Sequence, residues 1–158
     1  MARKGTNLAE APYKANIPVC IDIYCGAGGS TFGAAEAGLN VVYGVDRDQN
    51  AVDTFAKNHP DAYADCRDIA SVTSKEIMDL SGAIDIDYLL SGPNCQGVSQ
   101  MGLFWSDDPR NLMFVHLARI LDEFISMGKA PKNVIIENVA SIAFKKNIHI
   151  VRDLLSFF

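Results

Sequence analysis

The chain has 158 residues, 49% hydrophobic and 21% charged, with a formal net charge of -5 from 14 basic and 19 acidic side chains. This length and apolar content suit one globular domain, and no apolar run is long enough to span a bilayer. The acidic balance argues against a protein that holds nucleic acid by charge alone, because phosphate binding needs clustered Lys and Arg. The N-terminal residues lack the apolar segment of a secretory signal, so we expect a cytoplasmic protein.

Four cysteines occur, Cys20, Cys25, Cys66 and Cys95. No two of them form a CxxC pair, and no group of histidines accompanies them. The sequence therefore indicates neither a zinc site nor a disulfide framework, and we expect reduced thiols and no bound metal.

The predicted elements alternate along the chain. Residues 1–16 mix small, polar and charged types without periodicity, and we expect a flexible N-terminal segment there. Residues 17–158 alternate short apolar runs with helical patterns, each bounded by Gly, Asp or Asn. The predicted strands are 19–24, 41–45, 62–64, 87–90 and 134–137, and the predicted helices are 32–37, 51–57, 74–80, 111–127 and 150–157. This order predicts an α/β fold with a doubly wound, mostly parallel sheet.

Residues with chemical potential recur at the ends of these strands. Gly28, Asp46, Asp68, Cys95 and Glu137 each lie at or just past the end of a predicted strand. In open α/β sheets ligands bind outside the carboxyl ends of the strands. We therefore expect five separate segments to converge on one crevice.

A glycine-rich turn follows the first predicted strand. Gly26, Gly28 and Gly29 permit positive φ and let the backbone approach a ligand closely, as nucleotide sites require. The dinucleotide fingerprint GxGxxG needs a third glycine where this chain has Thr31. The turn therefore favours a phosphate-free nucleoside over a pyrophosphate cofactor.

Two carboxylates follow the next two predicted strands. Asp46 comes after the glycines by roughly the 20 residues expected of a carboxylate that binds ribose hydroxyls, although an ordinary polar strand end is the alternative. Asp68, followed by Ile69, can offer an acceptor to an adenine amino group beside an apolar wall. A surface loop aspartate is the alternative for Asp68.

Cys95 lies in a loop after a predicted buried strand, and Glu137 follows the next strand. This arrangement suggests covalent catalysis on an electron-poor ring, with the thiolate as nucleophile. A buried, inert cysteine is the commoner role of this residue type. Gly92, Pro93 and Gln96 around Cys95 favour exposure instead.

Four segments resemble, in order, the motifs of the DNA cytosine-5 methyltransferases. They are residues 22–29 (DIYCGAGG), 92–99 (GPNCQGVS), 107–112 (DDPRNL) and 137–139 (ENV), which resemble DLFAGxGG, GPPCQxxS, DxR and ENV. The resemblance implies a Rossmann-like S-adenosylmethionine-dependent methyltransferase fold that is incomplete on its C-terminal side. It also implies transfer of a methyl group from S-adenosylmethionine to C5 of a cytosine flipped out of double-stranded DNA, in a bacterial, archaeal or phage restriction-modification setting.

The resemblance also assigns roles to individual residues. Cys95 is expected to attack C6 of the cytosine, and Glu137 to hold and protonate N3. The implied cofactor-binding residues are Asp22, Tyr24, Gly26, Gly28, Gly29, Asp46, Arg47, Asp68, Ile69, Asn94 and Leu112. The implied substrate-binding residues are Gln96, Ser99 and Asn138. Removing a paired base from its stack costs a few kcal/mol, which a DNA interface must supply.

The chain departs from the family pattern in three respects. Asn94 replaces a usual proline, which frees φ, and Arg47 replaces a frequent aromatic, although a guanidinium can still stack on a ring. No QxRxR motif, later strands, target-recognition region or closing helix follows Glu137. We therefore expect an incomplete sheet with an exposed edge strand and an exposed apolar surface.

Two explanations fit the short length: one subunit of a split methyltransferase whose partner brings DNA recognition, or a truncated copy or fragment. In both cases we expect weak cofactor binding and no methylation by the chain alone. A tRNA cytosine-5 methyltransferase and a non-catalytic cofactor-binding or regulatory subunit are the alternatives. A nicotinamide-dependent oxidoreductase would use only the glycine turn and Asp46, and it leaves Cys95 and Glu137 unexplained.

Overall fold

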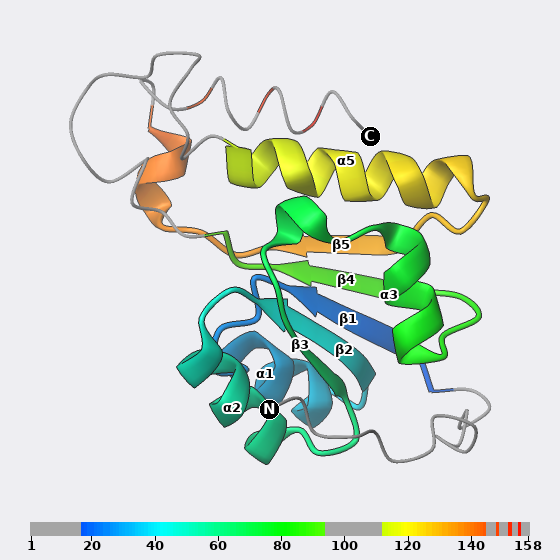
Figure 1. The fold of residues 1–158 in the computed structure, drawn as a ribbon. Coiled ribbons are helices and arrows are strands. Elements are labelled where there is room, and N and C mark those ends of the chain that lie inside the picture. Colours follow the sequence, from blue (N-terminus) through cyan, green and yellow to red (C-terminus); the bar gives the residue numbers. More distant parts are fainter. Residues whose placement is uncertain (1–16, 94–111, 145–147, 149–151, 153–154, 156–158) are drawn as a thin grey trace.

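A computed structural model of the chain describes residues 17–93, 112–144, 148, 152 and 155 (Figure 1). The predicted N-terminal segment 1–16 and the loop that carries Cys95 lie outside the described residues. Most of the predicted helix 150–157 lies outside them as well. Arg152 and Leu155, which are described, are helical.

Five parallel strands form one sheet. β1 (Val19–Ile23), β2 (Asn40–Asp46), β3 (Tyr63–Cys66), β4 (Tyr88–Ser91) and β5 (Asn133–Ile136) lie in the order β3-β2-β1-β4-β5. All four strand pairs are parallel. The predicted α/β fold with a doubly wound parallel sheet is confirmed, and each predicted strand is present. The strand order reverses between β1 and β4, so the predicted crevice belongs at the carboxyl ends of these two strands.

Helices cover both faces of the sheet (Figure 1). α1 (Gly29–Glu36) and α2 (Gln49–Asn58) lie on one face, while α3 (Ser74–Ser81) and α5 (Leu112–Ser126) lie on the other. These four correspond to the helices predicted over 32–37, 51–57, 74–80 and 111–127. Two short 3-10 turns, η2 (Ile69–Ser71) and η4 (Ala140–Ala143), are not predicted from the sequence.

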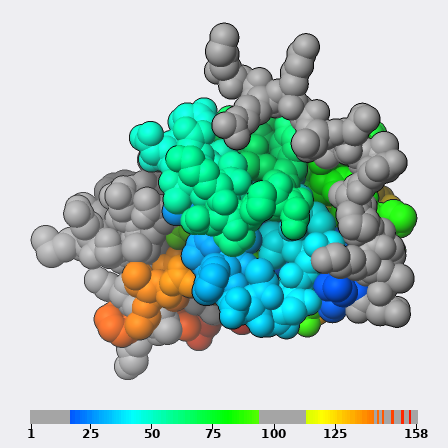
Figure 2. Space-filling view, turned by 90° about the horizontal axis from the view of Figure 1, so that it is seen from below, coloured from blue at the N-terminus to red at the C-terminus, as the bar shows by residue number. Residues whose placement is uncertain are grey.

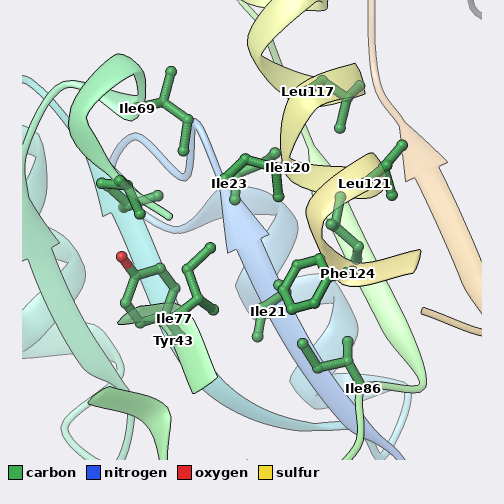
Figure 3. Packing of buried hydrophobic residues seen from close by; sticks show 13 residues of the cluster. Ile21, Ile23, Tyr43, Ile69, Ile77, Ile86, Leu117, Ile120, Leu121 and Phe124 are labelled. Atoms are coloured by element: carbon green, nitrogen blue, oxygen red, sulfur yellow. The ribbon is translucent and has the colours of Figure 1, made fainter. Parts of the chain in front are cut away.

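The larger core lies between the sheet and the α3 and α5 helices. Its fully buried residues come from the strands and from both helices, as Figure 3 shows for Ile21, Ile23, Tyr43, Ile77, Leu117, Ile120 and Phe124. Leu89 of β4 belongs to the same core. Each fully buried large apolar side chain contributes about 1.5–3 kcal/mol relative to exposure. This packing holds α5 firmly, and its first turns reach the carboxyl ends of the strands.

The opposite face is covered less completely. Ala34 of α1 packs with Cys20, Val41 and Leu90 on this side. Figure 2 shows this side of the molecule, with α1 and α2 at the surface and the segment after β5 (orange) at its margin. Ile135 of β5 is 49% exposed there.

β5 is an edge strand of the sheet, as the sequence predicts for an incomplete fold (Figure 1). Among the described residues no strand pairs with its outer side. Val139 and Phe144, which follow it, are also exposed. Within the described part of the chain, no helix has both the length and the apolar character needed to cross a membrane.

Candidate cofactor site at the strand ends

A cavity of about 370 Å³ lies at the carboxyl ends of β1 to β4. This volume falls within the range of small-molecule sites, about 300–1,000 Å³. The residues that line it come from five segments: Tyr24, Val45, Asp46, Arg47, Arg67, Asp68, Ile69, Ala70, Gly92, Met113 and His116. The structure therefore brings Asp46 and Asp68 to one cavity.

The glycine turn after β1 is held at both ends. The Gly26 amide donates to Oδ2 of Asp46 at 3.0 Å. At the other end, Nε2 of His59 lies 3.1 Å from the carbonyl oxygen of Gly28. Gly26 and Gly28 have φ values of 52° and 92°, in the region that favours glycine. The turn is thus a pinned backbone segment that leads directly into α1.

Asp22, in β1, is not among the residues that line the cavity. Its side chain is buried and accepts a hydrogen bond from Oγ1 of Thr31 at 2.7 Å. Burial raises the pKa of the Asp22 carboxyl to about 6, and the negative charge of Asp46 adds to the rise. The predicted cofactor residue Asp22 therefore binds the first turn of α1 through Thr31.

Asp46 is oriented by backbone amides. Its Oδ1 accepts from the amide of Asp48 at 3.0 Å, and its Oδ2 accepts from the amide of Gly26. A carboxylate oxygen accepts more than one hydrogen bond, so the side chain can still receive hydroxyl donors from a ligand. Arg47, next in the chain, is exposed and lines the same cavity.

Asp68 and Ile69 form another part of the wall. Oδ1 of Asp68 accepts from the amide of Ala70 at 2.9 Å and caps η2. The side chain of Ile69 is 5% exposed, and its carbonyl oxygen accepts from Nη2 of Arg119 at 2.7 Å. Hydrogen bonds therefore fix both residues that the sequence predicts for adenine binding, Asp68 and Ile69.

Arg67 lines the cavity but is already engaged by carboxylates. It pairs with Asp65 at 2.7 Å and with Glu76 at 2.9 Å. Asp65 is buried and also accepts from the hydroxyl of Tyr43 at 2.6 Å. This network, which the sequence reading missed, anchors the segment that carries Asp68.

The first turns of α5 close the cavity on another side. The Tyr24 hydroxyl donates to the carbonyl oxygen of Met113 at 2.8 Å and joins the end of β1 to α5. Met113 and His116 line the cavity, and neither is predicted from the sequence. Their spacing of three residues on a predicted helix is a signal that places both on one face. Leu112, the predicted residue, begins α5.

Glu137 lies next to the rim of this cavity. Its amide donates to the carbonyl oxygen of Ser91 at 2.9 Å, which continues the β4–β5 pairing. Its Oε2 is 3.7 Å from the position that a Cβ would take at Gly92, a residue that lines the cavity. The carboxyl group therefore lies beside the point where the chain leaves β4.

Asn138 contacts the same segment. Its Nδ2 donates to the carbonyl oxygen of Pro93 at 3.0 Å, and its Oδ1 accepts from the amide of Val139. Pro93 directly precedes the predicted catalytic loop. The predicted site residues of that loop, Asn94, Cys95, Gln96 and Ser99, lie outside the described residues.

The described cysteines are held as thiols. Burial raises the pKa of Cys20 to about 12 and that of Cys25 further still, with the negative charge of Asp22 adding in both cases. The pKa of Cys66 is also raised, first by desolvation and then by nearby aspartates. At neutral pH these three groups are poor nucleophiles.

The cavity is lined by charged groups of both signs and by apolar side chains. Asp46 and Asp68 supply carboxylates, Arg47 and Arg67 supply guanidinium groups, and Ile69 and Met113 form apolar wall. Nδ1 of His116 is buried and has no hydrogen-bond partner among the described residues. Carboxylates beside apolar side chains can hold the hydroxyls and the base of a nucleoside.

The strand order and the cavity at the switch point define a Rossmann-like α/β domain. The family model for the C-5 cytosine-specific DNA methylases matches residues 19–158. The chain belongs to this family, as the four motifs predict.

Individual relatives agree with this membership. The Type II methyltransferase M.AgeI of Thalassovita gelatinovora is 33% identical over 138 residues, which cover 86% of this chain and 31% of the relative. The Type II methyltransferase M.AquIA of Picosynechococcus is 31% identical over 122 residues, covering 75% of this chain and 47% of the relative. The chain spans about a third of the length of the first curated relatives that it matches.

Solved structures give the same picture. A DNA modification methyltransferase encoded within an E. coli prophage superimposes with a TM-score of 0.72 at 30% identity, over 89% of this chain and 37% of that chain. The DNMT2 of Spodoptera frugiperda superimposes with a TM-score of 0.64 at 26% identity, over 89% of this chain and 41% of that chain. Both confirm the methyltransferase-type fold.

Proposed function

We propose that this chain is the cofactor-binding and nucleophile-bearing part of a DNA (cytosine-5-)-methyltransferase that uses S-adenosylmethionine. The position of Glu137 carries the proposal. Its carboxyl group lies beside Gly92, where the chain leaves β4 at the rim of a nucleoside-sized cavity. Cys95 follows Gly92 by three residues. The loop that carries Cys95 therefore begins beside the carboxyl group of Glu137.

In this proposal the nucleoside of the cofactor lies between β2, η2 and α5. Asp46 binds the ribose hydroxyls, Asp68 accepts from the adenine amino group, and Ile69 with Met113 forms the apolar wall. Arg47 stacks on the base. When bound, S-adenosylmethionine supplies an electrophilic methyl group. The turn of Gly26, Gly28 and Gly29 allows close approach of the backbone to the rest of the cofactor.

The protein groups drive the reaction of the cytosine. The Cys95 thiolate forms a bond to C6 while Glu137 gives a proton to N3, so that electron density moves to C5. After C5 has gained the methyl group, a water molecule takes the proton from C5. Elimination of the Cys95 thiolate then breaks the sulfur–C6 bond and restores the ring, and N3 returns its proton. Gln96 and Ser99 are proposed to contact the flipped base, and Asn138 supports their loop through Pro93.

DNA recognition requires parts beyond these residues. The chain spans about a third of its relatives and carries a net charge of -5, so clustered cations for DNA must come from elsewhere. The open side of β5 and the exposed Ile135 offer a surface on which further structure can pack. We propose that structure beyond these 158 residues, whether further chain or a second polypeptide, supplies the remaining fold and the target recognition, and that these residues alone have no turnover. The description of the matching family model and that of the prophage-encoded structure both name DNA, which favours DNA over tRNA as substrate.

A covalent trap tests this function. The chain, together with any co-encoded partner, is incubated with S-adenosylmethionine and a duplex containing 5-fluorocytosine. Fluorine cannot leave C5 as the proton does, so a stable protein–DNA adduct forms at Cys95. Cys95→Ser abolishes the adduct, while Cys66→Ser, which removes a partly exposed thiol elsewhere, leaves it unchanged. An adduct at another cysteine, or no adduct with the partner present, overturns the proposal.

A further inference from the structure

Two side-chain hydroxyl groups tie α5 to the rest of the fold. The hydroxyl of Tyr24 donates to the carbonyl oxygen of Met113, in the first turn of α5, at 2.8 Å. The hydroxyl of Ser74, the first residue of α3, donates to the carbonyl oxygen of Ile120, two turns further on, also at 2.8 Å. Of these two hydrogen bonds, only the one from Tyr24 joins two residues that line the cavity at the strand ends.

The first turn of α5 is held less firmly by packing than the later turns. Four side chains of the later turns are buried in the core, as Figure 3 shows: Leu117, Ile120, Leu121 and Phe124. Met113 is only partly buried, and Val115 is exposed. The hydroxyl of Tyr24 therefore contacts α5 at the point where the core packing is weakest.

Tyr24 itself is held in an uncommon backbone conformation. Among the residues that the structure describes, it is the one residue other than glycine with a positive φ, 63°. A side chain disfavours this left-handed region, and such strain persists where the surrounding structure fixes it. Burial raises the pKa of the Tyr24 hydroxyl, and the negative charge of Asp68 adds to the rise. The group therefore stays protonated and remains a donor to Met113 at neutral pH.

We propose that the Tyr24 hydroxyl is a positioning group for the nucleoside site: it holds the first turn of α5 so that Met113 forms the cavity wall before a ligand binds. This inference rests on the proposed function and adds to it a role for the hydroxyl, distinct from that of the ring. A wall that is already in place requires no ordering when the ligand binds, which favours affinity. The hydroxyl acts through Met113 and does not contact the ligand.

Ligand binding to the full chain tests this role without DNA and without turnover. Affinity for S-adenosylhomocysteine and for 5′-methylthioadenosine, which has the base and the sugar but no amino acid, is measured by titration calorimetry or ligand-observed NMR. Tyr24→Phe keeps the ring and removes the hydroxyl, and we expect it to weaken both ligands by about 3- to 10-fold. The motif DLFAGxGG has phenylalanine at this position, so the variant should fold.

Ser74→Ala is the matched control. It also removes one hydroxyl-to-carbonyl hydrogen bond of 2.8 Å to α5, but neither Ser74 nor Ile120 lines the cavity. Urea unfolding should show a loss of stability in both variants, whereas only Tyr24→Phe should lose affinity. An equal loss of affinity in the two variants overturns the inference, because it would follow from a less stable helix alone.

A double-mutant cycle separates positioning from direct contact with the ligand. If the hydroxyl acts through the side chain of Met113, Tyr24→Phe should change affinity by less than about 2-fold when residue 113 is already alanine. Its effect on stability should persist in that background, because the hydrogen bond is made to the main chain. A further 3- to 10-fold loss of affinity in the Met113→Ala background, as expected of independent effects, overturns the positioning role.

The remaining outcomes distinguish this inference from the proposed function. If the folded, unaltered chain binds neither ligand, the proposed cofactor site falls, and the inference falls with it. If Asp46→Ala abolishes binding while Tyr24→Phe binds as the unaltered chain does, the site stands and the positioning role of the hydroxyl falls alone.

Discussion

The imidazole of His59 lies against the backbone of Gly28. Its Nε2 is 3.1 Å from the Gly28 carbonyl oxygen, and a Cβ added at Gly28 would lie only 2.5 Å from the same nitrogen. His59 is the residue at which α2 ends, and its ring packs on Phe55 with centroids 5.0 Å apart. The end of α2 therefore closes the glycine turn from outside, and glycine is required at position 28 both for space and for its φ of 92°.

Gly28→Ala should destabilise the protein. The new methyl group meets the His59 ring, and the left-handed backbone adds about 1–2 kcal/mol for an L-residue, so we expect a total loss of at least about 2 kcal/mol. Urea unfolding measures this loss. Gly33→Ala, within α1 and with no atom within 4 Å of its added Cβ, is the matched control. It should be as stable as the unaltered chain or more stable, by up to about 1 kcal/mol. Equal stability of the two variants would contradict the closed turn.

Asp22 should make stability fall as the pH rises. Burial raises its folded pKa to about 6 from an ordinary value of 3.8, so folding disfavours its charged form. Its contribution is therefore fully present below about pH 4 and is lost as the pH rises through about 6. In Asp22→Asn this dependence disappears. The free energy of unfolding of the unaltered chain minus that of the variant should fall by roughly 2–3 kcal/mol between pH 4 and pH 7.

Asp87 provides a control with the opposite sign. Hydrogen bonds from Lys132 and from the amide of Val19 lower its pKa. Its contribution is present above its unfolded pKa and is lost as the pH falls through the folded value. The same difference, measured with Asp87→Asn, should therefore rise from acid to neutral pH. Parallel slopes for the two variants would refute the assignment of the Asp22 shift to burial.

The network around Arg67 should depend on its buried member. Asp65→Ala leaves the Tyr43 hydroxyl and part of the Arg67 guanidinium without an acceptor, and we expect a loss of about 2–3 kcal/mol in urea unfolding. Glu76→Gln removes only an exposed charge from the same guanidinium and can keep the cap of α3, so its effect should be far smaller. If Glu76→Gln proves as damaging as Asp65→Ala, the anchor of the Asp68 segment lies elsewhere.

The elements and their order could be predicted from the sequence because their signals are local. The apolar runs, the glycine turn and the polar strand ends place Asp46 and Asp68 at one edge of a parallel sheet, which the structure confirms. The contacts of His59 with Gly28 and of Arg67 with Asp65 depend on packing between elements, and no periodicity reports them. Likewise, the sequence predicts His116 only as a residue of an amphipathic helix. Its place in the cavity lining follows from the packing of α5 on the sheet.

The family motifs predicted residues that the structure uses in different ways. The cavity is lined by Asp46, Arg47, Asp68 and Ile69, whereas Asp22 accepts a hydrogen bond from Thr31 of α1 and Asn138 donates one to the carbonyl oxygen of Pro93. A motif records which residues recur together. It does not distinguish residues that contact a ligand from residues that only position them. Their roles in binding stay predictions that the variants above address.

Asn138 should control the catalytic loop without contributing to the cofactor cavity. Its amide group holds the carbonyl oxygen of Pro93, two residues before Cys95, so Asn138→Ala frees the start of the loop. Because small misplacements of a nucleophile can cost up to about 100-fold in rate, we expect the 5-fluorocytosine adduct to form about 10- to 100-fold more slowly, with unchanged S-adenosylhomocysteine affinity. Asn133→Ala is the matched control, since Asn133 makes the same kind of bond, to the carbonyl oxygen of Asp87 at 3.2 Å, at the opposite end of β5. Both variants lose one asparagine-to-carbonyl hydrogen bond, so similar adduct rates for the two would show that the Asn138–Pro93 contact serves stability alone.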